Sequence, residues 1–165
     1  MKRIRLILCF IALFFIGTTY AQTEKMKALF IYSFTNYIDW PRGPHDVFVI
    51  TVLGDTPVQS ELEANSQLKK VNGTMIEVKK VVSVAEIGYT NIIFVPSSKK
   101  QLMSAIGSAL AGKNVLIVSD GATSDFGINF VMVNQKLSFQ VSKSRIQAHN
   151  LKVNSQLLSL GIAVN

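Results

Sequence analysis

The most constraining feature of the sequence is a short apolar, β-branched run that contains one polar side chain. Residues 47–53 read Val-Phe-Val-Ile-Thr-Val-Leu. A strand with one face in water alternates apolar and polar residues, whereas a strand covered on both faces is apolar throughout. The run therefore predicts a central parallel strand. Shorter apolar runs at 91–95 and 115–118 predict neighbouring strands of the same kind.

Segments with helical spacing separate these runs. Apolar residues recur at helical spacing between Met26 and Ile38, with Thr23 as a candidate N-cap, and Trp40-Pro41 stops this first helix. Residues 58–68 and 97–111 predict two further helices. Alternation of strands and helices favours an α/β fold, a three-layer sandwich with a mostly parallel central sheet and helices on both faces.

Three further segments complete this reading of the fold. The strand at 74–82 is polar enough to lie toward an edge of the sheet. Strands at 128–133 and 137–141, separated by Asn-Gln-Lys, predict a C-terminal antiparallel hairpin. Residues 153–164 predict a last apolar helix.

The first 21 residues have the organisation of a cleaved signal peptide. Three basic residues precede an apolar run of 12 residues, Leu6–Gly17, and the segment ends at the small residue Ala21. The run is shorter than the roughly 20 residues that span a membrane. Cleavage after Ala21 leaves a single secreted domain, residues 22–165, and removes the only cysteine, Cys9.

Composition and motifs argue against several classes of function. The mature chain keeps 14 basic and 10 acidic residues, a net charge of +4, and its lysines are scattered pairs rather than a nucleic-acid-binding stripe. No nucleophile elbow, dinucleotide fingerprint or P-loop is present, and His45 and His149 lack metal-like spacing. We therefore expect no catalytic residue, no metal and no cofactor.

Polar residues after the predicted strands suggest one alternative site. The carboxyl ends of parallel strands form the usual ligand crevice of an open α/β sheet. Residues placed there are Asp55, Ser97, Asp120 and Asp125. Asp and Gly are also ordinary turn formers, so these residues fit either simple turns or a small-ligand site.

The first helix carries more aromatic residues than one buried face normally needs. Some of them fill the core, and others are candidates for contact with a partner protein, because aromatic residues are enriched in the cores of interfaces. With the following loop, the candidate partner-binding residues are Phe30, Tyr32, Phe34, Tyr37, Trp40 and His45.

Five segments, taken in order, resemble the YfiR family of small periplasmic regulators. They are the aromatic stretch from Lys27 to Pro41, followed by Val52-Leu53-Gly54-Asp55, Ile93-Phe94-Val95, residues 116–120, and residues 137–158. The resemblance covers nearly the whole mature chain. It implies an α/β sandwich, no catalysis, a dimer, and a partner that is the periplasmic sensor part of an inner-membrane diguanylate cyclase, hence control of cyclic-di-GMP and biofilm formation.

The sequence departs from that family at two points. Better-known members use cysteines for disulfides and a redox response, and the mature chain has none. Phe126-Gly127 stands where the family tends to have paired glycines.

The sequence leaves two hypotheses for the function. One is a regulator that binds the sensor region of a cyclase or of a histidine kinase. The other is a small-ligand-binding module with its crevice at the carboxyl ends of the strands.

Overall fold

The computed structural model describes residues 21–41, 43 and 45–165 and confirms the predicted α/β sandwich. Its main sheet has eight strands in the order β10-β8-β7-β6-β5-β2-β4-β3. These strands are β2 (Val47–Leu53), β3 (Lys70–Val71), β4 (Thr74–Val81), β5 (Ile92–Val95), β6 (Leu116–Asp120), β7 (Ile128–Val133), β8 (Lys136–Ser142) and β10 (Ile162–Val164). The predicted signal peptide, apart from Ala21, lies outside the described residues.

The pairing of the strands follows the sequence prediction. β4, β2, β5, β6 and β7 pair in parallel. β7 and β8 form the predicted antiparallel hairpin, with Phe130 opposite Phe139. β4 lies next to the edge, because its outer neighbour β3 pairs with only its first two residues, Thr74 and Met75.

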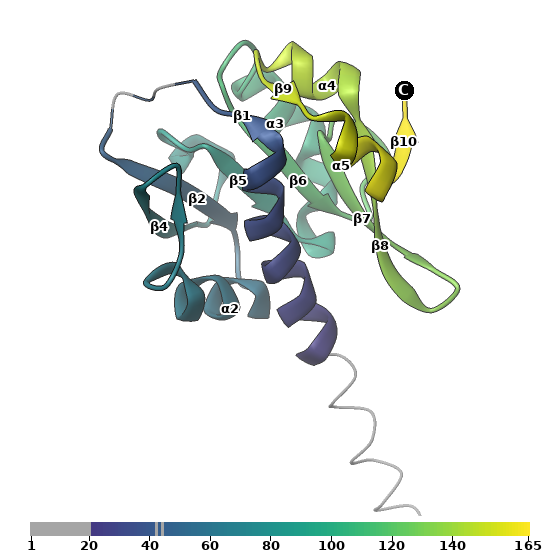
Figure 1. Ribbon diagram of the computed structural model, residues 1–165, viewed down its shortest axis with the longest axis horizontal. Helices are drawn as coiled ribbons and strands as arrows, with labels where there is room; N and C mark the ends of the chain where they lie inside the picture. Colours follow the sequence, from purple (N-terminus) through teal and green to yellow (C-terminus); the bar gives the residue numbers. More distant parts are fainter. Residues whose placement is uncertain (1–20, 42, 44) are drawn as a thin grey trace, which may run out of the picture.

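Helices cover both faces of the sheet. The first helix is described over residues 21–34 and crosses the front of the sheet in Figure 1. The other helices are α2 (Pro57–Ser66), α3 (Met103–Ala109), α4 (Lys143–Ala148) and α5 (Ser155–Leu160), with the 3-10 turns η1 (Thr35–Tyr37), η2 (Val84–Glu86) and η3 (Ser97–Leu102). In the described part of the chain, no helix is long and apolar enough to cross a membrane.

The sheet separates two hydrophobic clusters, as expected for apolar strands covered on both faces. Ile92 and Phe94 of β5 pack in the cluster that includes residues of helix 21–34 and α2. Ile93 and Val95 pack in the other, with α3. Successive side chains of a strand point to opposite faces, so one four-residue strand serves both clusters.

The two ends of the domain differ from the sequence prediction. Helix 21–34 already includes Thr23, which therefore does not cap it. Residues 153–164 form the end of β9 (Lys152–Val153), the short helix α5 and then β10, not one helix. Gly161 ends α5 in an extended conformation, and Ile162, Ala163 and Val164 after it pair with β8. A separate two-stranded sheet pairs β1 (Ile38–Asp39) with β9 (Lys152–Val153).

Candidate functional site

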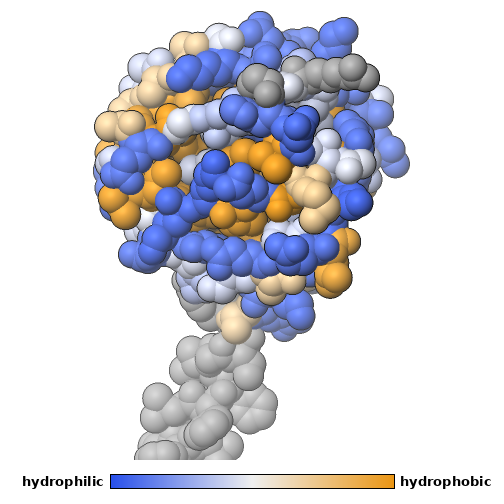
Figure 2. Space-filling view, turned by 90° about the vertical axis from the view of Figure 1, so that its left-hand side faces the viewer, coloured by the Kyte–Doolittle hydropathy of each residue, from blue (hydrophilic) through white to orange (hydrophobic). Residues whose placement is uncertain are grey.

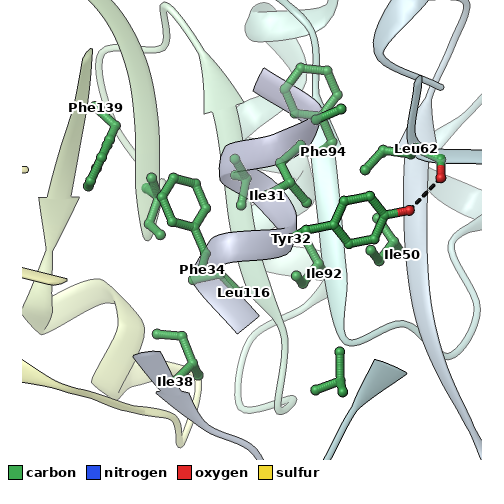
Figure 3. Packing of buried hydrophobic residues seen from close by; sticks show 14 of the residues in the cluster. Ile31, Tyr32, Phe34, Ile38, Ile50, Leu62, Ile92, Phe94, Leu116 and Phe139 are labelled. Carbon is green, nitrogen blue, oxygen red and sulfur yellow. Dashed lines mark hydrogen bonds between the residues drawn. The ribbon is translucent and has the colours of Figure 1, made fainter. Parts of the chain in front are cut away.

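Two of the aromatic residues predicted to meet a partner belong to the core. Tyr32 is 4% exposed and Phe34 is 1% exposed. The Tyr32 hydroxyl donates a hydrogen bond to the carbonyl oxygen of Leu62 in α2 (Figure 3), and burial raises the pKa of Tyr32 to about 12. These two side chains hold helix 21–34 against the sheet and α2, which removes them from the accessible surface.

The other aromatic residues of this segment are partly buried. Phe30 packs against the ring of Phe139, with ring centres 5.5 Å apart, and Tyr37 packs against the same cluster. Trp40 donates a hydrogen bond from Nε1 to the carbonyl oxygen of Thr35 over 2.9 Å and meets the ring of Phe48 edge-on at 4.9 Å. Trp40 is thus a fixed, half-buried ring at the start of the loop that leads into β2.

His45 is exposed and pairs with a ring that the sequence analysis did not single out. The rings of His45 and Tyr89 lie 4.4 Å apart in a T-shaped arrangement. Asn91 donates a hydrogen bond from Nδ2 to the Tyr89 hydroxyl over 3.2 Å, and its Oδ1 accepts one from the Val49 amide over 2.9 Å. Asn91 is 7% exposed, so it ties the Tyr89 ring to the rigid strand β2.

Three cavities meet at Tyr89. The largest, of about 770 Å³, lies between Trp40, the start of β2 and the Asn72-Gly73 turn. Two others, of about 440 Å³ and 250 Å³, also have Tyr89 in their walls. We call this region the amino-end cleft, because it lies where β2, β4 and β5 begin. Figure 2 faces the side of the molecule that carries β4 and α2, where hydrophobic surface is visible in recesses between hydrophilic side chains.

The polar residues predicted to form a ligand crevice do not come together. Asp55 has an 89% exposed side chain and accepts a 2.8 Å hydrogen bond from Lys80, which lowers the pKa of the Asp55 carboxyl. Ser97 is exposed at the start of η3. Asp125 lines a cavity of about 330 Å³ between α3 and α4, and none of the other three lines that cavity or the three cavities at Tyr89.

The path of the chain after β6 separates Asp125 from the carboxyl ends of the strands. β7 is parallel to β6 and its first residue, Ile128, pairs with Val118. The loop has therefore turned back by the time it reaches Asp125. The Asp125 carboxylate lies 3.2 Å from the Arg145 guanidinium of α4, and its Cβ lies beside Gly107 of α3.

Asp120 belongs to a buried ion cluster that the sequence analysis missed. The Lys27 ammonium lies 2.7 Å from Oε1 of Glu24 and 2.7 Å from Oδ2 of Asp120. The side chains of Lys27 and Glu24 are 8% and 5% exposed. Burial alone lowers the pKa of Lys27, but the hydrogen bonds and charges of the two carboxylates outweigh it and raise the pKa above 10.5. The cluster ties helix 21–34 to the end of β6.

The two histidines lie apart. His149 places Nδ1 3.3 Å from the carbonyl oxygen of Lys113, near α4, while His45 lies beside Tyr89. Among the residues that the structure describes, no three His, Cys, Asp or Glu side chains gather in a way that could hold a metal ion.

Comparison with known proteins agrees with the resemblance seen in the sequence. No curated protein matches the chain. Residues 24–162 match the model of the YfiR/HmsC-like family, from Glu24 of the buried ion cluster to Ile162 in the last strand. That family is one of periplasmic, regulatory, non-catalytic proteins connected with diguanylate cyclase signalling. Because the match spans all but the two ends of the chain, the protein belongs to the YfiR/HmsC-like family.

Proposed function

We propose that this protein binds and restrains the periplasmic sensor part of an inner-membrane diguanylate cyclase. The observation that carries the proposal is membership of the YfiR/HmsC-like family over residues 24–162. A periplasmic protein reaches such an enzyme through the part of it that projects into the periplasm, and restraint there lowers cyclic-di-GMP and biofilm formation. Export through a signal peptide cleaved after Ala21 belongs to the same proposal.

The contact surface in this proposal is the rim of the amino-end cleft. Of the predicted partner-binding residues, His45 is exposed, and Phe30, Tyr37 and Trp40 keep part of their surface. The rings of Trp40 and His45 are held in place, because Trp40 packs against the ring of Phe48 and His45 packs against the ring of Tyr89. A partner that covers rings already held in place loses little side-chain entropy on binding, which favours affinity.

The test is capture from detergent-solubilised envelopes of cells that make the protein, with tagged residues 22–165 as bait and mass spectrometry as readout. We expect recovery of a membrane protein that carries a cyclase domain. Recovery of a histidine kinase instead would show that the partner is a kinase and not a cyclase. Recovery of nothing above background would contradict regulation by direct contact.

A matched pair of histidine substitutions tests the surface. His45→Ala removes a ring from the cleft rim, whereas His149→Ala removes the histidine near α4. We expect His45→Ala to weaken partner capture by about tenfold, the effect of losing one well-packed aromatic contact, and His149→Ala to leave it unchanged. Equal capture by both variants would place the contact elsewhere. A mass measurement in solution tests the dimer that the resemblance implies.

A further inference from the structure

The amino-end cleft has the size and wall chemistry of a small-molecule site. Its largest cavity measures about 770 Å³, within the roughly 300–1,000 Å³ of typical ligand pockets. It lies between the start of β2 and the β3–β4 turn, away from the carboxyl-end residues Asp55, Ser97 and Asp120. A ligand site here is distinct from the crevice that the sequence suggested.

Aromatic rings form one part of its described wall. Trp40, Phe48 and Tyr89 all line the large cavity, together with His45. Hydrogen bonds hold two of these rings: Trp40 donates from Nε1 to the Thr35 carbonyl oxygen, and Asn91 donates to the Tyr89 hydroxyl. The loop passes so close to Tyr89 that a Cβ on Gly43 would lie 2.0 Å from its hydroxyl oxygen.

Uncharged polar groups and one carboxylate complete the wall. Asn72 contributes an amide, Thr74 a hydroxyl and Asp46 a carboxylate. The Asn91 amide lies in the same wall and is already bonded to Tyr89 and Val49. Asn72 lies in the left-handed region, with φ 49°, in a tight turn before Gly73. Amide and hydroxyl groups both donate and accept hydrogen bonds, and a carboxylate accepts them.

From this combination we propose that the amino-end cleft binds a neutral saccharide. A sugar ring presents C–H groups on its faces and hydroxyl groups around its edge. The C–H face packs on the negative face of an aromatic ring, and the hydroxyls need both donors and acceptors at the side. Fixed rings beside amide, hydroxyl and carboxylate groups supply both needs. The inference goes beyond the proposed function, because saccharide binding needs no protein partner.

The chain carries its own reporter for this binding. Trp40 is the only tryptophan in the sequence, so tryptophan fluorescence reports on the cleft alone. We would titrate the secreted protein, residues 22–165, with tri-N-acetylchitotriose, cellotriose and maltotriose, and follow both fluorescence and heat of binding. At least one trisaccharide should change the fluorescence and release or absorb heat with the same dissociation constant.

Variants decide whether the site is the cleft. Tyr89→Ala should weaken binding about tenfold by removing a stacking ring. Asn72→Gly keeps the left-handed turn and removes one amide, and should weaken binding about fivefold. Gln59→Ala, in α2 and not in the wall of any of the three cavities at Tyr89, is the control and should bind as the original protein does. Circular dichroism checks that each variant is folded, and Asn72→Gly keeps the test valid if Tyr89→Ala does not fold.

Two results would overturn the inference. One is no heat and no fluorescence change with all three trisaccharides at millimolar concentration. The other is binding that Tyr89→Ala and Asn72→Gly leave unchanged, which would place the sugar elsewhere. Since these titrations use the isolated protein, their failure would leave the partner proposal intact, and failure to capture a membrane partner would leave saccharide binding intact.

Discussion

Replacement of Lys27 by Met tests the buried ion cluster most directly. Methionine keeps an unbranched side chain in the same place but removes the charge. Glu24, with a 5% exposed side chain, and Asp120, with a 22% exposed side chain, then face each other without a cation. Removing one partner of a buried ion pair costs about 3–5 kcal/mol, mostly because the remaining charge is left unpaired. Since Asp120 keeps some access to water, we expect a loss of about 3 kcal/mol.

The loss is measured as a change in the free energy of unfolding by urea, or as a fall in Tm. For a domain of this size, about 3 kcal/mol corresponds to a fall in Tm of roughly 6–12 °C. The control is Lys79→Met. Lys79 and Glu77 form a surface pair at 3.4 Å with side chains 48% and 46% exposed, and such pairs contribute less than about 1 kcal/mol.

A triple variant separates charge from packing. Glu24→Gln, Lys27→Met and Asp120→Asn together leave no buried charge, so most of the lost stability should return. The sign of the pH dependence also follows. The pKa of Lys27 is raised on folding. The contribution of the Lys27 charge to the free energy of unfolding is therefore complete below pH 10.5 and is lost as the pH rises above that value. A loss in Lys27→Met no larger than in Lys79→Met would refute the reasoning.

Two further changes test the core and the last strand. Tyr32→Phe should cost about 1 kcal/mol by removing the buried hydrogen bond from the Tyr32 hydroxyl to the Leu62 carbonyl oxygen. It should also abolish a tyrosine titration near pH 12 seen by ultraviolet absorbance. Because the pKa of Tyr32 is raised from 10.0 to about 12, its contribution to stability is complete below pH 10 and is lost between pH 10 and 12; an unchanged absorbance titration would contradict this assignment. Gly161→Ala places a Cβ 2.5 Å from Phe139 Cε2 and 3.0 Å from the Phe139 carbonyl oxygen, and should cost about 1–3 kcal/mol. Gly88→Ala, with open space around its Cβ, is the matched control, and equal urea midpoints for the two would show that β10 does not need the close approach.

Local patterns in the sequence were enough to predict the layered fold. Runs such as 47–53 are apolar at nearly every position, and only a strand covered on both faces buries all of them. The helical spacing before Trp40 and the polar turn between β7 and β8 are equally local signals. Each prediction depended on neighbours in the chain, so it could be made without knowing what lay across the sheet.

Which side chains contact one another became clear from the three-dimensional fold and not from the sequence. Tyr32 and Trp40 are both aromatic residues of one amphipathic segment, but α2 covers Tyr32, whereas Trp40 lies at the cleft. Asp120 and Asp125 are five residues apart, but the chain reverses direction between β6 and β7. Asp120 therefore contacts Lys27, whereas Asp125 contacts Arg145. Trp40 and Tyr89, which are far apart in the sequence, likewise line the same cavity because of the course of the chain. Contacts between distant residues depend on the order of strands in the sheet and the course of the loops, which local patterns of apolar and polar residues do not specify.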